Sequence, residues 1–361
     1  MTRAKIPNTI PIMTQIKGNV VRWGILGCGD VTERKSGPGF RLAENSALVA
    51  VMRRDGAKAA DYAKRHGVPR WYDDAEKLIR DPEVDAVYVA TPPGSHLEYA
   101  LRVAAAGKQC YVEKPMARSL VECRRMIEAF ERAKLPLFVA YYRRALPRFV
   151  RVKELLDGGA IGRVTGCRYR MSRLFFANPQ PQWRLDATQS GGGVFLDVGS
   201  HVIDLLDHLL GEFVEYGGSA QTTGATQVED VVAVNFRTNQ GVIGSASWNF
   251  AASDKEELLE IDGTEGRLAM EVLGWSPITL SRGGAVVETF EVQDPPHIQQ
   301  PLIQTIVNEL LGNGTCPSTG VSAARASAVM DAALSRFYNG RADEFWSRPQ
   351  TWNKREARDE Q

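Results

Sequence analysis

Hydrophobic residues between positions 20 and 142 gather in short, nearly continuous runs that alternate with helical patterns. Such runs are typical of parallel strands that helices cover on both faces of the sheet. The alternation of strands with helices predicts a doubly wound α/β domain. The runs that we interpret as strands are VVRWGIL (20–26), ALVAVMR (47–53), VDAVYVA (84–90), QCYVEK (109–114) and PLFVAYY (136–142).

Polar residues mark the starts and ends of the helices between these strands. Ser95 with Glu98, and Ser119 with Glu122, have the spacing of a capping box, in which each side chain bonds the other residue's backbone. Gly107 follows the first of these helices and is expected to be its C-terminal cap.

The segment after the first strand breaks the expected pattern. Residues 36–39, Ser-Gly-Pro-Gly, interrupt a crossover helix that should start at Asp30. We therefore expect a loop above the carboxyl edge of the sheet, where ligands bind in this architecture. Lys35 lies in that loop and is expected to be solvated rather than to reach a site.

The pattern changes after about residue 150, where strands follow one another without helices between them. Residues 228–250 read as two strands around an Asn239–Gly241 turn, and residues 256–272 as two more around Gly263–Gly266. Helical segments follow near 299–312 and 321–338. These features predict an α+β domain with a large, mostly antiparallel open sheet.

The domain boundaries follow from these changes of pattern. We expect an N-terminal extension (1–18), a doubly wound α/β domain (19–145), a C-terminal α+β domain (146–340) and a tail (341–361). The tail is crowded with charged residues and is expected to fray from about residue 347.

Charge and composition exclude several classes of protein. The formal net charge is +1, so the chain lacks the basic surplus of a nucleic-acid or anionic-membrane binder. Its longest apolar runs are too short to span a bilayer, and the N-terminus has no apolar core of a secretory signal. The five cysteines have no zinc-site spacing and fit small buried residues in a reducing cytoplasm.

A glycine turn directly follows the first strand. Gly27-x-Gly29 permits a tight turn and close approach of a pyrophosphate, although Thr32 stands where the fingerprint has Gly or Ala. Its place in an alternating strand–helix pattern makes a Rossmann dinucleotide site the favoured interpretation.

The end of the second strand bears on which dinucleotide binds. NAD enzymes commonly place a carboxylate there for the ribose hydroxyls, whereas this chain has Arg53 and Arg54. Two guanidinium groups suit a 2′-phosphate, so NADP(H) is favoured over NAD(H). The alternative is that both arginines are solvated and Asp55 binds the ribose.

One helical segment carries a narrow polar stripe. In GGGVFLDVGSHVIDLLDHLLG (191–211), Asp197, His201, Asp204 and His208 recur at steps of four, three and four. A solvated face, a metal site and catalytic machinery are all consistent with that spacing, but no third metal ligand suggests itself. We therefore expect no metal.

The segments GILGCGDV, ATPPGSH (90–96), EKP (113–115) and the stretch just described occur in the order and spacing of a known family. Together they resemble the Gfo/Idh/MocA oxidoreductases over about residues 20–340. The resemblance implies an NAD(P)-dependent enzyme acting on a sugar, polyol or inositol-like alcohol or ketone. It also implies a cleft between the two domains and a homodimer or homotetramer formed through the C-terminal sheet.

The family's catalytic lysine, aspartate and histidine match Lys114, Asp197 and His201. Histidine suits the acid/base role because its ordinary pKa lies near neutrality. Asp197, one turn earlier, is expected to orient the imidazole, and Lys114 to polarise the reacting oxygen. The Lys114–Pro115 bond resembles a family site that is often cis. Asp204 and His208 lie deeper and are expected to be structural.

The resemblance also implies binding residues. The expected cofactor contacts are Gly27, Gly29, Asp30, Val31, Arg53, Arg54, Thr91, Pro92, His96, Glu113 and Lys114. The expected substrate contacts are Tyr142, Arg144, Trp183, Arg184 and His201. Two alternatives stay open: Trp183 and Tyr142 also fit a domain-interface core, and His96 fits a helix cap. We expect His297 to lie outside the site.

Two other functions belong to relatives with this fold. One is a glycosidase that oxidises its sugar transiently, eliminates the leaving group and reduces the sugar again. The other is a sensor that binds a dinucleotide without catalysis, and the presence of Lys114, Asp197 and His201 together argues against it.

Overall fold

The computed structural model describes residues 16, 18–175, 182–224 and 226–352, and its first sheet is entirely parallel. The strand order β3-β2-β1-β4-β5-β6 is that of a Rossmann domain, as predicted. The strands are β1 (Val21–Leu26), β2 (Ser46–Met52), β3 (Arg70–Tyr72), β4 (Ala86–Val89), β5 (Gln109–Val112) and β6 (Leu137–Val139). The sequence missed β3, because this edge strand has only three residues and none of them is buried.

Helices cover this sheet: α1 (Asp30–Arg34), α2 (Gly37–Leu42), α3 (Gly56–His66), α4 (Ala75–Ile79), α5 (His96–Ala105) and α6 (Leu120–Ala133). The loop expected at residues 36–39 is wrong. Only Lys35 and Ser36 interrupt the helix, and Pro38 lies in the first turn of α2, where proline is tolerated. A side chain at Gly37 would lie 2.1 Å from the Thr32 carbonyl oxygen, so the glycine lets α2 pack against α1.

The expected caps are present in part. Gly107 has φ +73° just after α5, as a C-terminal cap requires. The Ser119 hydroxyl accepts a hydrogen bond from the Glu122 backbone, but the Glu122 carboxylate binds a neighbouring arginine instead of closing the box. The Ser95 hydroxyl donates to the Thr91 hydroxyl instead of capping α5, so that capping box is wrong.

The second sheet has eight strands in the order β14-β13-β12-β11-β7-β10-β9-β8. Its pairs are antiparallel except β7 with β10, which confirms the predicted mostly antiparallel sheet. The strands are β7 (Val164–Leu174), β8 (Phe213–Gln221), β9 (Val231–Thr238), β10 (Ile243–Asn249), β11 (Ala251–Gly263), β12 (Arg267–Met270), β13 (Ile278–Arg282) and β14 (Ala285–Phe290).

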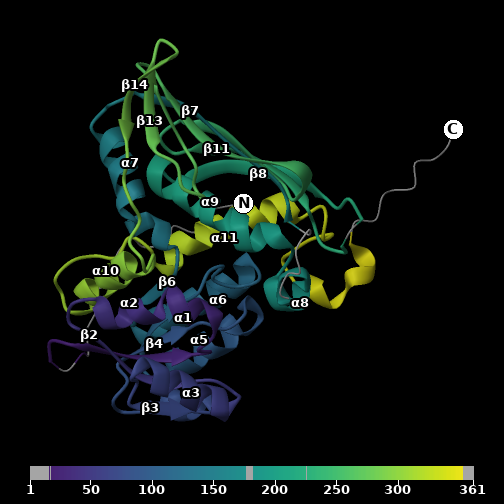
Figure 1. Cartoon of the computed structure of the whole chain (residues 1–361). Coiled ribbons are helices and arrows are strands. Elements are labelled where there is room, and N and C mark those ends of the chain that lie inside the picture. The colour runs from purple at the N-terminus through teal and green to yellow at the C-terminus, as the bar shows by residue number, and fades with distance from the viewer. Residues whose placement is uncertain (1–15, 17, 176–181, 225, 353–361) are drawn as a thin grey trace.

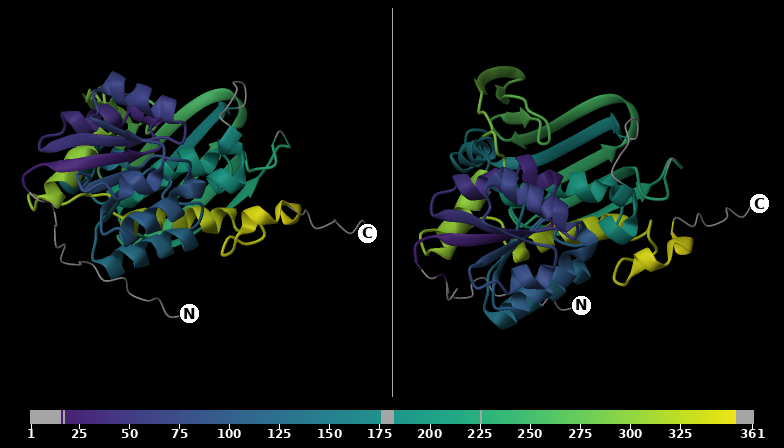
Figure 2. Two further views of the ribbon diagram at one scale, coloured as in Figure 1. Left: turned by 90° about the horizontal axis from the view of Figure 1, so that it is seen from below. Right: turned by 60° about the horizontal axis from the view of Figure 1, so that its bottom comes forward.

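Two helices join the sheets. In Figure 1, α9 (Val194–Leu210) and α11 (Gly320–Leu334) lie between the antiparallel sheet and the Rossmann layer. Figure 2 shows from below the yellow C-terminal helix α11 running along the purple-to-blue Rossmann layer. Burial alternates along β9 and β10, with one face against these helices and the other exposed. The remaining α-helices are α7 (Pro147–Asp157), α8 (Ala187–Ser190) and α10 (Gln300–Leu310).

The segment beyond residue 340 packs against the rest of the chain. Arg341 is buried and donates to the Gly191 and Arg118 carbonyl oxygens at 2.8 Å each. Phe345 is fully buried, and two short 3-10 turns follow, ending at Thr351. The expected fraying from residue 347 is therefore wrong up to Trp352, which bonds the Phe345 carbonyl oxygen at 2.9 Å. The N-terminal extension, apart from residues 16 and 18, and the end of the tail lie outside the described residues.

All five cysteines are buried and unpaired, as expected of small core residues. Across the described ranges, no helix has the length and apolar character needed to cross a membrane.

Candidate active site

Three cavities follow one another along the cleft between the two sheets. The glycine-turn cavity (about 360 Å³) is lined by Gly27, Gly29, Arg53, Arg54, Thr91 and neighbouring residues. The central cavity (about 500 Å³) shares Gly29, Arg53 and Thr91 with it and adds Lys114, Asp197 and His201. The sheet-side cavity (about 370 Å³) shares the last three and extends to β7 and β11. Shared lining residues make the three cavities one continuous site.

The glycine turn has the geometry of a dinucleotide site. Gly27 has φ +87°, and a Cβ there would lie 2.7 Å from the Thr91 methyl group. A Cβ on Gly29 would approach nothing more closely than the Gly27 carbonyl oxygen at 3.9 Å, and this residue lines both the glycine-turn and the central cavity. The Thr32 hydroxyl accepts from the Gly29 N–H at 2.9 Å and donates to the Gly29 carbonyl oxygen at 2.8 Å. Thr32 therefore stabilises the turn from the fingerprint's third position.

Positive charge dominates the outer end of the glycine-turn cavity. Arg53, Arg54 and Lys58 line it together with Asp55. The Asp55 carboxylate caps α3 by accepting from the Lys58 N–H at 3.2 Å, and it pairs with the Lys58 ammonium at 3.4 Å. Asp55 is thus already engaged, whereas neither arginine pairs with a carboxylate in the part of the chain that the structure describes.

Lys114 lies just after β5, and its bond to Pro115 is cis, as the resemblance implied. Its ammonium donates to the Asp197 carboxylate and, at 3.0 Å, to the Asp197 carbonyl oxygen. The other carboxylate oxygen accepts from Arg184 Nε at 2.7 Å. Burial raises the pKa of Asp197, but Lys114 and Arg184 outweigh burial and hold it at about 2. Asp197 is therefore ionised and shared between two cations.

This pairing corrects the expected role of Asp197, because its carboxylate holds Lys114 instead of orienting His201. The imidazole is buried and lies at the edge of the Tyr142 ring, with 5.1 Å between ring centroids. Its Nδ1 is sealed from solvent and has no hydrogen-bond partner within the described ranges. Burial, reinforced by the charges of Arg143, Lys114 and Lys35, holds the pKa of His201 well below its usual range. The imidazole is neutral at physiological pH.

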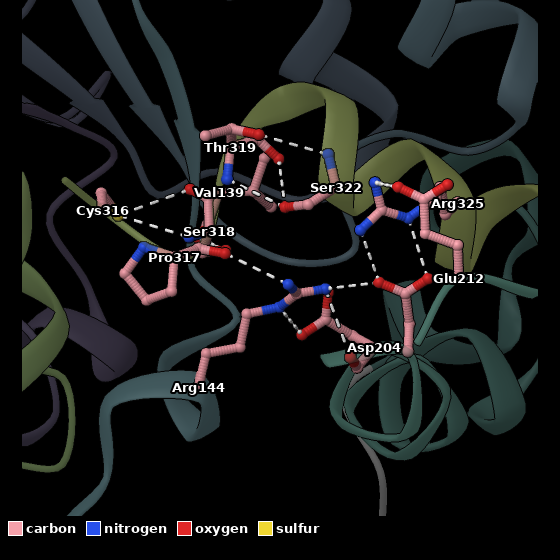
Figure 3. A network of polar contacts seen from close by, with 11 residues as sticks. Val139, Arg144, Asp204, Glu212, Cys316, Pro317, Ser318, Thr319, Ser322 and Arg325 are labelled. Atoms are coloured by element: carbon pink, nitrogen blue, oxygen red, sulfur yellow. Dashed lines mark hydrogen bonds and ion pairs between the residues drawn. The ribbon is translucent and has the colours of Figure 1, made fainter. Parts of the chain in front are cut away.

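Arg144 does not line any of the three cavities, so the predicted substrate contact is wrong. Its buried guanidinium donates to Asp204 at 2.8 and 2.7 Å and to the Pro317 carbonyl oxygen at 3.1 Å (Figure 3). It also donates to Asp207 at 3.2 Å. The preceding Arg143 lines the sheet-side cavity instead. Adjacent residues at a turn point in different directions, and the sequence carries no signal that distinguishes these two arginines.

The deeper half of the polar stripe also lies outside the cavities. Asp204 is fully buried, and burial raises its pKa to about 6 against the opposing effect of Arg144. Burial lowers the pKa of His208 to about 4. Asp207, which the stripe does not include, accepts from Arg325 at 2.8 and 2.7 Å. Both Asp204 and Asp207 anchor α9 to neighbouring elements.

His96 is wrong as a cofactor contact. It is fully buried, and its ring nitrogens face the Thr91 carbonyl oxygen at 2.6 Å and the Pro115 carbonyl oxygen at 3.1 Å. It therefore links the loop after β4 to the cis-proline loop and lines none of the three cavities. His297 contacts the Arg34 carbonyl oxygen at 2.8 Å and also lies outside the cavities, as expected.

Two residues of the central cavity were not anticipated. Lys35, which we expected to be solvated only, lines both the central and the sheet-side cavities. Gln299, just before α10, donates to the Glu113 carboxylate at 2.6 Å, and the other Glu113 oxygen accepts from the Lys114 N–H at 3.0 Å. Gln299 is 186 positions from Glu113, so no local pattern could connect them.

The remaining expected contacts line the cavities. Asp30, Val31, Pro92, Glu113, Tyr142, Trp183 and Arg184 all border the central cavity. Trp183 is half-buried, and the Arg184 guanidinium lies 5.0 Å from its ring centroid, so Trp183 belongs to the cavity wall. No group of three or more potential metal ligands occurs in residues 18–175, 182–224 and 226–352.

The glycines before α9 serve chain packing. Gly191 has φ +81°, and a Cβ there would lie 2.5 Å from the Arg118 carbonyl oxygen. A Cβ on Gly193 would lie 2.5 Å from the Glu229 carbonyl oxygen, and the Gly193 N–H donates to the Glu229 carboxylate at 2.9 Å. The glycines thus let buried backbone approach the start of the helix, rather than admitting a ligand.

Comparison with known proteins places the chain among oxidoreductases. Residues 21–141 match the family model described as an oxidoreductase family with an NAD-binding Rossmann fold, and residues 149–269 match the Gfo/Idh/MocA C-terminal domain. Oxidoreductase P35 of Formosa agariphila is 39% identical over 315 residues, covering 86% of this chain and 97% of that protein. The 1,5-anhydro-D-fructose reductase of Ensifer adhaerens is 30% identical over 331 residues, covering 90% and 98%.

Solved structures share the fold. Levoglucosan dehydrogenase in complex with NADH and levoglucosan superposes with a TM-score of 0.78 at 23% identity, covering 87% of this chain and 96% of that chain. An oxidoreductase from Agrobacterium radiobacter, solved with NAD⁺, L-tartaric acid and magnesium, superposes with a TM-score of 0.77 at 22% identity, covering 89% and 97%. At this identity the likeness establishes the fold alone.

Proposed function

The chain belongs to the Gfo/Idh/MocA family of NAD-binding oxidoreductases, and on that premise we propose that it interconverts a secondary alcohol and a ketone on a sugar, polyol or inositol-like substrate. The observation that carries this proposal is the position of Lys114, Asp197 and His201. All three border both the central cavity, which continues to the glycine turn, and the sheet-side cavity. A substrate held between these cavities meets the charged groups and the cofactor site together.

The dinucleotide, when bound, supplies the hydride acceptor for oxidation or the hydride donor for reduction. Gly27 and Gly29 would hold its pyrophosphate, because both glycines line the glycine-turn cavity. Arg53 and Arg54 would bind a 2′-phosphate, so NADP(H) is the preferred cofactor. Asp55 does not oppose this preference, because it already pairs with Lys58.

The residues have separate roles in alcohol oxidation. The hydroxyl proton passes to the neutral imidazole of His201, whose low pKa keeps it in the proton-accepting form. The Lys114 ammonium stabilises the negative charge that develops on the same oxygen as its carbon loses hydride. Asp197 holds that ammonium in place through its carboxylate and its carbonyl oxygen. Reduction of the ketone runs these steps in reverse.

Substitution of the two proposed catalytic groups tests the function. Lys114→Met and His201→Asn should each lower kcat by about 10²- to 10⁴-fold, the usual contribution of acid–base groups. The affinity for NADPH, measured by fluorescence titration, should change little. His208→Asn is the matched control, because His208 lies on the same helix outside the cavities. Turnover close to wild type in both catalytic variants would refute the proposal.

The same assay separates this function from its rivals. Stoichiometric change of nicotinamide absorbance with product excludes both a glycosidase, which regenerates its cofactor, and a non-catalytic sensor. Turnover of aryl glycosides without net change of NAD(P)H would instead favour the glycosidase.

We propose further that the exposed face of the antiparallel sheet forms a homodimer or homotetramer interface. This face carries small and apolar side chains such as Ala233, Ser245 and the exposed Ile243. Light scattering of the wild type and of Ile243→Lys tests this, and an unchanged oligomer mass in the variant would contradict it.

A further inference from the structure

The sheet-side cavity carries more positive than negative charge. Six cationic side chains line it, against three carboxylates. The cationic residues are Lys35, Lys114, Arg143, Arg173, Arg184 and Lys255, and the carboxylates are Asp197, Glu256 and Glu257. A cavity for a neutral sugar needs no such surplus, since hydroxyl groups are satisfied by neutral donors and acceptors.

Within the described residues, none of the three carboxylates forms an ion pair with Arg143, Arg173 or Lys255, so the charge of these three cations has no direct counter-ion. Asp197 is shared by Lys114 and Arg184. Glu256 accepts from Arg170 Nε at 2.5 Å, outside the cavity lining. Glu257 accepts from the backbone N–H groups of residues 272–274 at 2.6–3.0 Å, so it serves to hold that loop.

Among the six cationic residues that line the cavity, Arg143 is buried, with 7% of its surface exposed. Its Nε donates to the Val272 carbonyl oxygen at 3.1 Å, and Nη1 donates to the Tyr142 hydroxyl at 3.0 Å. Within the described ranges no carboxylate pairs with it, and Nη2 donates no hydrogen bond. Burying a cation without a counter-ion is costly, so an anionic ligand at this position would compensate the charge.

The cofactor does not account for this charge. Arg143, Arg173 and Lys255 line the sheet-side cavity but neither of the two cavities that reach the glycine turn. Arg173 lies on β7, Lys255 on β11 and Arg143 in the turn after β6, so three separate segments bring cations to one place. Arg173 and Lys255 also pair with no carboxylate in the part of the chain described.

We propose that the substrate is a sugar or polyol that carries an anionic oxygen group, either a carboxylate or an ester-linked sulfate or phosphate. The anionic group binds Arg143, Arg173 and Lys255, while the reacting hydroxyl lies at Lys114 and His201. This assignment rests on the proposed function for the position of the reacting carbon. The anion site itself stands on the charge and burial of the sheet-side cavity.

Matched ligands test the proposal on the NADPH-bound enzyme. D-Glucuronate, D-galacturonate, D-gluconate, glucose 6-sulfate and glucose 6-phosphate are compared with D-glucose, D-galactose and D-sorbitol. Binding is measured by calorimetry, and turnover by nicotinamide absorbance with either cofactor redox state. At least one of the anionic ligands should bind roughly 10- to 100-fold more tightly than its neutral counterpart, the range of one charge-assisted hydrogen bond. The acids and the two esters separate the possible sources of the anionic group.

Substitutions of the lining cations test whether the preference for anionic ligands arises from the sheet-side cavity. Arg143→Gln and the double variant Arg173→Gln/Lys255→Gln should each reduce the acid-to-neutral preference roughly 10-fold or more. Arg168→Gln is the matched control, because Arg168 lies on the same strand β7 but does not line the cavity. If Arg143→Gln unfolds, the double variant of two exposed residues still decides the outcome.

The possible results lead to distinct conclusions. Equal or weaker binding of every anionic ligand, or no binding by any ligand, overturns the anion site. A preference that survives in both variants overturns it as well. Tighter binding of an acid without turnover of any ligand supports the anion site and refutes the proposed function instead.

Discussion

Replacement of Arg144 by methionine should destabilise the protein by about 3–5 kcal/mol and leave substrate recognition intact. The buried guanidinium is the only hydrogen-bond partner of the Asp204 carboxylate within the described residues, through bonds of 2.8 and 2.7 Å. Asp207 keeps its two bonds to Arg325 in the variant. The variant therefore leaves one carboxylate buried without a partner, and the stated cost is that of breaking a buried ion pair.

The pH dependence of this effect has a definite sign. The pKa of Asp204 is raised in the folded state to about 6, so between about pH 4 and pH 6 this carboxyl is more protonated in the native than in the unfolded state. Stability due to this group falls as the pH rises from the unfolded pKa through the folded one. Arg144 lowers that pKa, so its removal extends the fall to higher pH. The stability deficit of Arg144→Met should thus be larger at pH 8 than at pH 5.

Urea unfolding followed by tryptophan fluorescence and circular dichroism measures these differences, provided that the two probes coincide. Arg65→Met is the matched control, because Arg65 also pairs with two carboxylates but is 47% exposed, and it should cost less than about 1 kcal/mol. The double variant Arg144→Met/Asp204→Leu should recover about 2–3 kcal/mol, since no buried charge remains at position 204. A loss below about 1 kcal/mol, or a tenfold rise in KM with unchanged stability, would refute this reasoning and restore Arg144 as a substrate contact.

Three further predictions concern the catalytic cleft. The double variant Arg53→Ser/Arg54→Ser should lose about 10- to 100-fold in affinity for NADPH and much less for NADH, and equal losses by fluorescence titration would contradict the 2′-phosphate assignment. In the pH profile of kcat/KM for alcohol oxidation, the fall toward acid should lie below about pH 6.5, because the pKa of His201 is lowered. If this acid limb lies at higher pH, His201 is excluded as the base. Asp197→Asn should reduce kcat by about 100-fold through displacement of Lys114 without moving that limb, and a shifted limb would show that Asp197 acts on the imidazole after all.

The architecture of this protein could be predicted from its sequence because a buried strand appears as a local run of apolar residues. Five of the six Rossmann strands, the paired strands around Gly241 and Gly263, and the helix at 194–210 all follow from apolar spacing and turn residues. Strand β3 could not be predicted in this way, because this edge strand has only three residues, none of them buried, and therefore no apolar run. Residues 36–39 were predicted to form a loop because they contain Pro38, but proline is tolerated in the first turn of a helix, where Pro38 lies in α2.

Much of the candidate site was also accessible from the sequence. The glycine turn, Lys114, Asp197, His201 and Trp183 were expected at the site, and the structure places all of them along one continuous cleft. The order of strands and turns predicted the glycine turn, whereas the other four residues were expected because their motifs resemble those of the family.

Only the tertiary structure decided which charges meet. Sequence spacing suggested that Asp197 serves His201, but its carboxylate is bound by Lys114, 83 positions away, and by Arg184. Sequence spacing likewise could not show that Arg143 lines the sheet-side cavity while Arg144 is buried against Asp204, 60 positions away. The physical reason is the sequence separation over which each feature is determined. Apolar periodicity depends on residues within one or two turns of the chain. An ion pair depends on the distance and burial of side chains from segments that only the fold brings together.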